Sequence, residues 1–167
     1  MTRRREFSPA AYEGGDMADR YLDDFAAGLM FRSATARIDA NQIIEFATEF
    51  DPQPFHLDEE AARGSIFRGL AASGWHTAAI TMKLLVSSDL KPAGGIIGGG
   101  FDELRWPKPV RPGDELHVEG EVLEVRVSKS NPAQGFIKLR TATMNQKNEV
   151  VQLSIGNLLV PRRESAA

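Results

Sequence analysis

An aspartate and a histidine lie five positions apart in "FDPQPFHLDEEAARG", the segment from Phe50 to Gly64. Two prolines between Asp51 and His56 preset part of the backbone, which holds the two side chains at a defined separation. A carboxylate and an imidazole fixed in this way can exchange protons with a substrate or a water molecule. The same residues also fit a structural role, in which Asp51 ends a helix and His56 bonds a backbone carbonyl group. The spacing by itself leaves both interpretations open.

Capping residues and helical periodicity predict the elements that position this pair. Asp39 can cap a helix over residues 40–50, and Pro52 ends it. Three apolar residues recur at helical spacing on one face of that helix: Ile43, Ala47 and Phe50. A second short helix begins after Asp58 and closes at Gly64. The Asp/His pair is therefore expected between two helix ends.

The rest of the chain predicts one long helix and a run of strands. The segment from about Leu70 to Val86 is apolar almost all round, which predicts a helix buried on most sides. A strand is predicted over 29–38, and four more follow the long helix at 96–106, 114–127, 135–145 and 150–160. The apolar parity changes between Val122 and Leu123, which predicts a bulge. These elements indicate a single α+β domain over residues 21–163, with a curved antiparallel sheet facing a central helix, after a loose lead-in over 1–20.

Composition excludes several classes of function. The net charge of −3 gives no reason to expect a nucleic-acid partner, whose phosphates attract Lys and Arg. The chain has no cysteine, which excludes disulfides and thiolate catalysis and fits a reducing, cytoplasmic location. Its longest charge-free stretch, residues 69–82, is shorter than the roughly 20 apolar residues of a membrane span. Three histidines without metal-binding spacing predict no metal site.

The segment "DPQPFHLDEEAA" resembles the signature of the MaoC-like dehydratases, the (R)-specific enoyl-CoA hydratases of hot-dog fold. That motif runs Asp, any residue, Asn, Pro, a hydrophobic residue, His, and an acid two positions on. Five residues fall on matching positions: Asp51, Pro54, Phe55, His56 and Asp58. Two later segments, "RGLAASGW" and "GGGFDELRWPKPVRPGDEL", resemble family segments in the same order. The resemblance spans about residues 25–160 and implies a single hot-dog domain.

The resemblance also implies a reaction and roles in it. Asp51 and His56 would hold and activate a water molecule and return its proton to the α-carbon. Gly74 would donate its backbone N–H to the thioester oxygen from the start of the long helix, where amides are unpaired. The reaction would be reversible hydration of a trans-2-enoyl thioester of coenzyme A or acyl carrier protein to the (R)-3-hydroxyacyl thioester. The resemblance further implies no metal or redox cofactor, and a homodimer or dimer of dimers.

The chain departs from the family pattern around these positions. Gln53 stands where the family has Asn, and Ser73 and Trp75 replace the His and Met that flank Gly74. Met82 stands where some members have a helix serine. We group Gln53, Ser73 and Trp75 with Gly74 as oxyanion or substrate-binding residues, and expect the departures to change the pocket or the substrate.

Two other functions remain open on the sequence. Ser73, His56 and Asp51 could form a nucleophile, base and orienting acid for thioester hydrolysis. "LAASGW" is not the Gly-x-Ser-x-Gly elbow of serine hydrolases, which argues against that arrangement. A non-catalytic acyl-CoA-binding protein with a drifted pocket is the other alternative, and the Gln53 departure favours it.

The remaining histidines and the tryptophans are expected to be structural. His76 lies within the long helix and is predicted to be a core residue, whereas His117 is predicted to face solvent from a strand. Trp75 and Trp106 are expected to pack in the core, and Trp75, beside Gly74, could also shape the acyl pocket.

Overall fold

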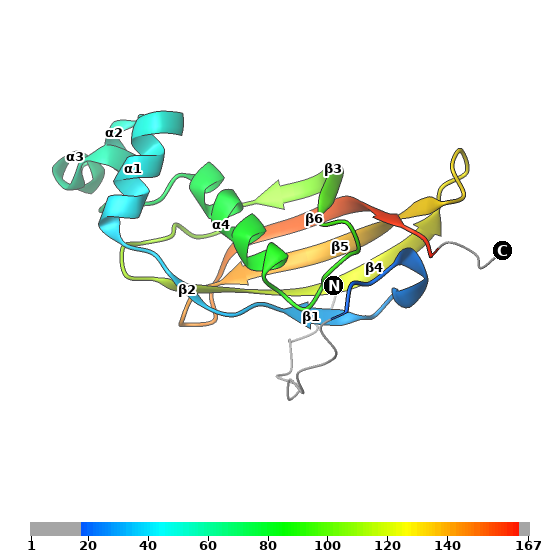
Figure 1. The fold of residues 1–167 in the computed structure, drawn as a ribbon. Helices are drawn as coiled ribbons and strands as arrows, with labels where there is room; N and C mark the ends of the chain where they lie inside the picture. Colours follow the sequence, from blue (N-terminus) through cyan, green and yellow to red (C-terminus); the bar gives the residue numbers. More distant parts are fainter. Residues whose placement is uncertain (1–17, 164–167) are drawn as a thin grey trace, which may run out of the picture.

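The computed structural model describes residues 18–163 and places one long helix, α4 (Gly74–Val86), against a six-stranded antiparallel sheet (Figure 1). The strands are β1 (Met30–Arg32), β2 (Ala36–Arg37), β3 (Ile97–Arg105), β4 (Glu115–Val127), β5 (Gln134–Met144) and β6 (Val150–Pro161). The strand order is β1-β4-β5-β6-β3, and β2 also pairs with β4. This arrangement confirms the predicted α+β architecture. Most of the predicted lead-in, residues 1–17, lies outside the described residues.

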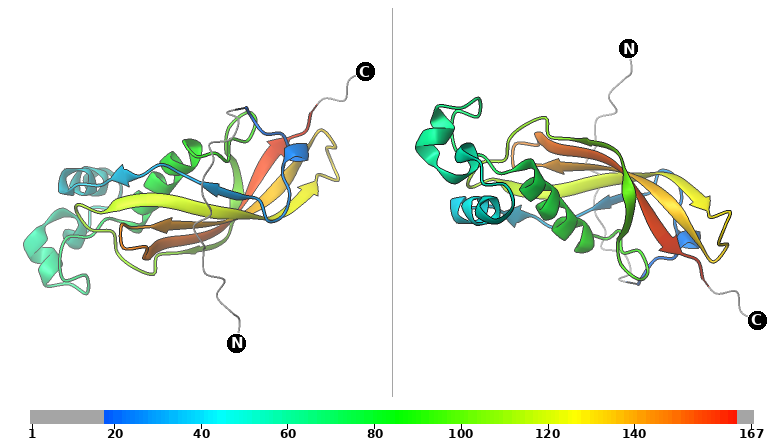
Figure 2. Two further views of the ribbon diagram at one scale, coloured as in Figure 1. Left: turned by 90° about the horizontal axis from the view of Figure 1, so that it is seen from below. Right: turned by 90° about the horizontal axis from the view of Figure 1, so that it is seen from above.

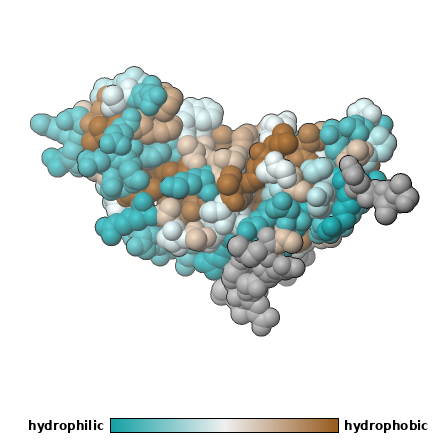
Figure 3. All heavy atoms as spheres, viewed as in Figure 1, coloured by the Kyte–Doolittle hydropathy of each residue, from teal (hydrophilic) through white to brown (hydrophobic). Residues whose placement is uncertain are grey.

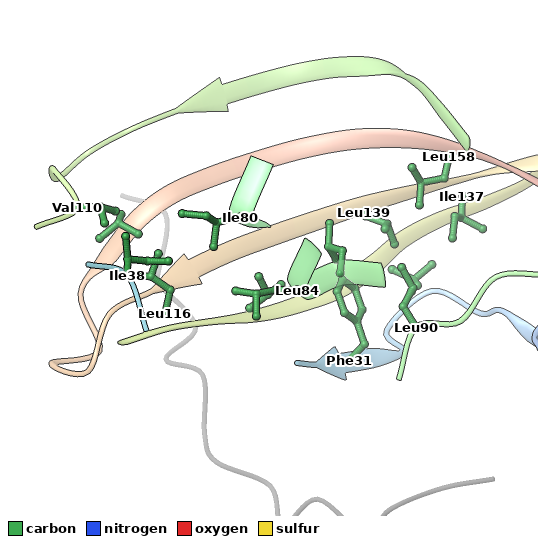
Figure 4. Close-up of a cluster of buried hydrophobic side chains, with 14 of the residues drawn as sticks. Phe31, Ile38, Ile80, Leu84, Leu90, Val110, Leu116, Ile137, Leu139 and Leu158 are labelled. Atoms are coloured by element: carbon green, nitrogen blue, oxygen red, sulfur yellow. The ribbon is translucent and has the colours of Figure 1, made fainter. Parts of the chain in front are cut away.

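The core lies between α4 and the face of the sheet that α4 crosses (Figure 2). Ile80 and Leu84 of α4 point toward the sheet in Figure 4. They are joined there by buried residues of other segments: Phe31, Ile38, Leu90, Val110, Leu116, Ile137, Leu139 and Leu158. Each such side chain contributes about 1.5–3 kcal/mol by leaving water. This shared core holds α4 in place relative to the sheet.

The long helix is shorter and more exposed than predicted. It begins at Gly74, not at Leu70, because the chain before it is extended and Ala72 N–H donates to the Val110 carbonyl at 2.9 Å. The prediction that the helix is buried on most sides is also wrong, since the sheet covers only one face. Three large apolar side chains on the opposite side are exposed: Trp75 (61%), Met82 (39%) and Val86 (62%).

The strand predicted over 29–38 is split into β1 and β2. Between them the Ser33 backbone N–H donates to the Val118 carbonyl at 2.9 Å, and the Ser33 hydroxyl accepts from Val118 N–H at 2.8 Å. The serine side chain thus takes a backbone hydrogen bond that a continuous strand would have used. The bulge predicted in β4 is confirmed, because its pairing with β5 shifts register between Val122 and Glu124.

Three short helices, α1 (Ala40–Phe50), α2 (Pro54–Leu57) and α3 (Glu59–Arg63), lie beyond the N-terminal end of α4 (Figure 1). Asp39 caps α1 as predicted: its carboxylate accepts from Gln42 N–H, and the Gln42 side chain accepts from Asp39 N–H, both at 2.9 Å. The Asp58 carboxylate caps α3 in the predicted way, accepting from Ala61 N–H at 2.7 Å. The single turn of α2 was not predicted; its first residue is a proline, which is favoured there because that N–H has no partner in a helix.

One face of α1 packs against the body of the protein. Ile43 and Ala47, on the predicted apolar face, are fully buried. Phe50, the third residue of that face, is 63% exposed. It is the last residue of α1 and contacts only the Phe46 ring among the aromatic residues described, with centroids 5.0 Å apart.

The predicted environments of the other aromatic residues are partly wrong. His76 is buried as expected, and its ring stacks on Phe46 at 4.6 Å between centroids. His117 is buried rather than solvated, because the side chains of Arg32 and Glu119 lie beside it on the same face. Trp75 and Trp106 are not core residues, since 61% and 39% of their surfaces are exposed. No helix within residues 18–163 is long and apolar enough to span a membrane.

Candidate active site

Three helix ends bring the chemically active residues together. Asp51 is the C-terminal cap of α1, His56 lies in α2, and Ser73 is the N-terminal cap of α4. The turn between α1 and α2 is closed by hydrogen bonds from Gln53 N–H to the Asp51 carbonyl (2.7 Å) and from His56 N–H to the Gln53 carbonyl (2.9 Å). Pro52 and Pro54 preset the backbone of this turn, so little conformational freedom remains.

The His56 imidazole is buried and its orientation is fixed from one side. Only 4% of the residue is exposed, and Nδ1 lies 2.6 Å from the Ala71 carbonyl oxygen. A carbonyl oxygen can only accept, which assigns the ring proton to Nδ1. In the neutral ring, Nε2 then carries a lone pair, and this nitrogen lies 3.5 Å from Oδ2 of Asp51. The backbone contact anticipated for a structural histidine is present, and it also aims Nε2 at the carboxylate.

The Asp51 carboxylate is held through both of its oxygens. The Ser73 hydroxyl donates to Oδ2 at 2.7 Å, and the Gln53 side-chain amide donates to Oδ1 at 2.6 Å. Partial burial raises the pKa of Asp51, but the hydrogen bonds from Ser73 and Gln53 and the adjacent His56 outweigh it and leave this pKa below its usual value. Asp51 is therefore ionised at neutral pH.

When the His56 ring is neutral, its Nε2 and Oδ2 of Asp51 are two acceptors that face each other. At 3.5 Å they are too far apart for a direct hydrogen bond, and neither has a proton to donate to the other. A molecule with two donor hydrogens, such as water, satisfies both at once. A water held by both hydrogens presents its oxygen lone pairs to whatever lies beside the pair. The arrangement is therefore suited to activating water.

Gly74 is the first residue of α4, and its N–H has no hydrogen-bond partner among the described residues. The positive end of the helix dipole lies at this amide, which favours a negative oxygen there. The Trp106 ring lies directly on Gly74: a Cβ at position 74 would come within 2.7 Å of a ring carbon. Trp106 is fixed in turn by donating its indole N–H to the Gln152 side chain at 2.8 Å.

A cleft of about 660 Å³ opens beside these residues. His56, Gly74, Thr77 and Trp106 form part of its wall, and the segments 66–68 and 107–111 complete most of the rest. Among residues 18–163 no acidic residue lines the cleft, whereas three basic side chains belong to those segments: Arg68, Lys108 and Arg111. The cleft therefore favours an anionic ligand.

The four predicted oxyanion or substrate-binding residues do not all face the cleft. Gly74 lines the cleft, whereas Ser73 is fully buried and directs its hydroxyl to Asp51. Gln53 is exposed and also bonds Asp51. Trp75 lies on the exposed side of α4 and meets the Trp106 ring edge to face, 5.4 Å away. Ser73 and Gln53 thus surround the carboxylate, and only Gly74 faces the cleft.

Two contributors to the site were missed in the sequence. The Ala71 carbonyl that fixes His56 is a backbone group, so no residue type indicates it. Trp106 was expected in the core, and its position over Gly74 joins segments 32 residues apart. The sequence indicates this contact only through Gly74, because a glycine at the start of a helix leaves room for another side chain to pack against the first turn.

The geometry does not favour Ser73 as a nucleophile. Its hydroxyl donates to Asp51 and accepts from Trp75 N–H at 3.2 Å, so no bond links it to the imidazole that would have to remove its proton. Within residues 18–163, no three His, Cys, Asp or Glu side chains are grouped closely enough to hold a metal ion.

Comparisons with known proteins agree with this geometry. The family model for the MaoC like domain matches residues 28–143. A crystal structure of the MaoC-like dehydratase from Rhodospirillum rubrum is 58% identical and superposes with a TM-score of 0.84, covering 87% of this chain and 99% of that one. The R-hydratase PhaJ1 from Pseudomonas aeruginosa, in unliganded form, is 26% identical with a TM-score of 0.66, covering 88% of this chain and 92% of that one.

A mesaconyl-CoA hydratase from Cereibacter sphaeroides is 40% identical over 68 residues, which is 41% of this chain and 20% of that protein. The chain thus corresponds to about a fifth of that relative's length. The matched family model covers both the Asp51–His56 turn and the start of α4, and the R. rubrum structure reproduces the fold along nearly its whole length. With its antiparallel sheet against one long helix, this chain has the hot-dog fold and belongs to the MaoC-like dehydratase family.

Proposed function

We propose that this protein is a hydratase/dehydratase that adds water reversibly to a trans-2-enoyl thioester and forms the (R)-3-hydroxyacyl thioester. The observation that carries the proposal is the placement of Nε2 of His56, whose Nδ1 is bonded to the Ala71 carbonyl, 3.5 Å from Oδ2 of Asp51. The R-hydratase and the mesaconyl-CoA hydratase among the similar proteins support the same reaction class.

In the proposed mechanism the water donates one hydrogen to each acceptor and its oxygen attacks C3 of the enoyl group. The lowered pKa of Asp51 makes its carboxylate a weak base, so we assign proton removal to His56 and water orientation to Asp51. The negative charge that reaches the thioester oxygen is stabilised by Gly74 N–H, a kind of donor typically worth about 10²–10³ in rate. The imidazolium then returns the proton to C2, so a hydroxyl group and a hydrogen are added overall. The thioester activates its own α-carbon, and the reaction uses no cofactor.

The basic cleft supports a phosphate-bearing carrier, which coenzyme A and the phosphopantetheine arm of acyl carrier protein both provide. Lys108 is already paired with Glu149 at 2.5 Å. Arg68 lies at the cleft, is exposed, and has no ion-pair partner among the described residues. We assign Arg68 as the side chain best placed to meet a carrier phosphate.

The exposed side of α4 supports a homodimer. Trp75, Met82 and Val86 form an apolar stripe, which we define by these three residues, and Ile97 and Phe101 of the edge strand β3 are also about half exposed. Figure 3 shows apolar surface gathered over the middle of the molecule, in the region of α4 and β3. A second copy of the chain would cover the stripe and the unpaired edge of β3 together, and leaving either in water is unfavourable.

An assay with crotonyl-CoA tests the proposed reaction and separates it from the alternatives. Loss of the enoyl-thioester absorbance without release of free thiol is expected; thiol release would indicate hydrolysis, and neither change would indicate a binding protein. Asp51→Asn and His56→Ala should each lower the rate by about 10²–10⁴-fold, the usual contribution of a positioned acid or base.

Asp23→Asn is a matched control, because Asp23 is an exposed carboxylate paired with Arg162. It should leave the rate unchanged. Hydration at the wild-type rate by both the Asp51→Asn and His56→Ala variants would refute the assignment of the pair.

A further inference from the structure

Arg111 is a charged side chain that lines the cleft without pairing with an acid. In the part of the chain that the structure describes, it forms no ion pair. Its guanidinium instead donates to three backbone carbonyl groups of one loop: Nη1 to Gly69 (2.7 Å) and Leu70 (3.2 Å), and Nη2 to Phe67. A planar guanidinium with five donors in a fixed fork can satisfy several carbonyls at once, which the compact ammonium of lysine cannot.

The loop that Arg111 contacts has a backbone that needs support. Arg68 has φ of 56° and Gly69 has φ of 155°. A non-glycine residue in the left-handed region is strained and persists only where surrounding contacts determine it. The donors of Arg111 reach the carbonyl groups on both sides of Arg68, so they are placed to hold this conformation.

The base of the Arg111 side chain is itself anchored. Its backbone N–H donates to one carboxylate oxygen of Asp114 at 2.8 Å, and the Gln146 amide donates to the other at 3.0 Å. Asp114 is buried. The guanidinium therefore extends from a fixed turn, and the loop is fastened to the sheet through it.

The fastened loop leads directly to the imidazole. Leu70 O is held by Arg111, and Ala72 N–H donates to the carbonyl of Val110, the neighbour of Arg111, at 2.9 Å. Ala71 lies between these two fixed points, and its carbonyl is the group that Nδ1 of His56 contacts at 2.6 Å.

We infer that Arg111 is a positioning residue: its guanidinium group fixes the Phe67–Leu70 segment and so places the Ala71 carbonyl that selects the tautomer and orientation of His56. The catalytic meaning of this role rests on the proposed hydratase function. The contact itself does not, because the tautomer of His56 can be measured without substrate.

The test uses the full chain labelled with ¹⁵N histidine and long-range ¹H–¹⁵N spectra of the His56 ring. The wild type should show one tautomer with the proton on Nδ1, and Arg111→Lys should show a mixture of tautomers. With the enoyl thioester, Arg111→Lys should lower kcat by about 10–100-fold, the usual result of displacing a reacting group by about 1 Å, with a much smaller change in KM. Arg126→Lys is the matched control, because Arg126 is an exposed arginine paired with Glu124 and should leave spectrum and kcat unchanged.

A second variant approaches the same contact from the loop. Gly69→Ala forces a side chain onto a left-handed backbone, 3.5 Å from Nη1, while it retains the guanidinium. It should produce the same mixture of tautomers, and it decides the question if Arg111→Lys does not fold. A single Nδ1-protonated tautomer in the folded variants would overturn the inference. Absence of hydration by the wild type would refute the proposed function only, and the spectra would still decide the role of Arg111.

Discussion

Replacing Ser73 by alanine tests how the carboxylate of the site is held. The Ser73 hydroxyl is fully buried, donates to Asp51 at 2.7 Å and accepts from Trp75 N–H at 3.2 Å. A hydrogen bond to a charged group contributes about 1.5–3 kcal/mol, and an N-terminal cap contributes about 0.5–2 kcal/mol. Ser73→Ala should therefore lower the free energy of unfolding by roughly 2–5 kcal/mol at neutral pH.

The two parts of this loss can be separated by pairing the variant with Asp51→Asn. The amide of Asn carries no charge, so the charged hydrogen bond is already absent from the Asp51→Asn protein. Ser73→Ala made in that background should cost the cap, about 0.5–2 kcal/mol, and a neutral hydrogen bond to the Asn amide oxygen, about 0.5–1.5 kcal/mol. The remainder is the coupling between the two residues, about 1–2 kcal/mol, which lies within the range found for contacting groups.

Urea unfolding of the wild type, both single variants and the double variant gives this coupling at pH 7. The hydrogen bond from Ser73 also helps to hold the pKa of Asp51 in the folded protein below its usual value. Its contribution to stability is therefore present above the pKa of aspartate in the unfolded chain, near 3.9, and disappears as pH falls through the pKa of Asp51 in the folded protein. The coupling should therefore vanish in acid.

Ser88→Ala is the matched control, since Ser88 is equally buried but donates to a neutral carbonyl, that of Leu85, at 2.7 Å. It should show no coupling to Asp51 at any pH. Additive effects of Ser73→Ala and Asp51→Asn at pH 7 would refute the electrostatic role of the Ser73 hydroxyl.

Three further variants test other parts of the structure. Burial lowers the pKa of His76, so the unfolded chain binds a proton at higher pH than the folded protein, and stability falls as pH drops below about 6.5. His76→Phe should reduce this loss of stability between pH 7.5 and pH 5, measured by urea unfolding. An unchanged loss between the two pH values would contradict the role of His76. Gly74→Ala should displace the Trp106 ring and lower the free energy of unfolding by about 1–2 kcal/mol, because hydrogen-bond and ring contacts are lost. The NMR resonance of the Trp106 indole N–H should shift, and an unchanged resonance would contradict the packing of Trp106 on Gly74. Met82→Glu should weaken self-association measured by sedimentation equilibrium. Val127 is an exposed apolar residue of β4, and Val127→Glu should leave self-association unchanged. Equal self-association of the two variants would place the interface elsewhere.

The elements whose signals are local were predictable from sequence. Asp39 and Asp58 cap their helices in the predicted way because capping involves residues only three positions apart. The parity change after Val122 marked the bulge in β4, because side chains alternate faces along a strand.

The errors arose where contacts are distant in sequence. The segment from Leu70 is apolar enough for helix, but Val110, about 40 residues later, takes the Ala72 N–H and keeps it extended. Alternation placed His117 on the outer face of the sheet, which is correct, but could not show that neighbouring strands bury it. An apolar residue on a helix also suggests a core position when no other part of its own chain covers it, which is why Trp75 was misplaced.

The candidate site shows the same division between local and distant determinants. The Asp51–His56 separation is set by six consecutive residues, and for that reason the sequence indicated the pair. What aims Nε2 at the carboxylate is the Ala71 carbonyl, which fixes a proton on the far side of the ring, and the residues on either side of Ala71 are held by Val110 and Arg111. Replacing Asp51 or His56 should remove the chemistry, whereas changing Arg111 should leave both groups present and misalign them. These two kinds of loss differ in the His56 tautomer, so the spectra separate the residues that carry the proposed reaction from those that orient them.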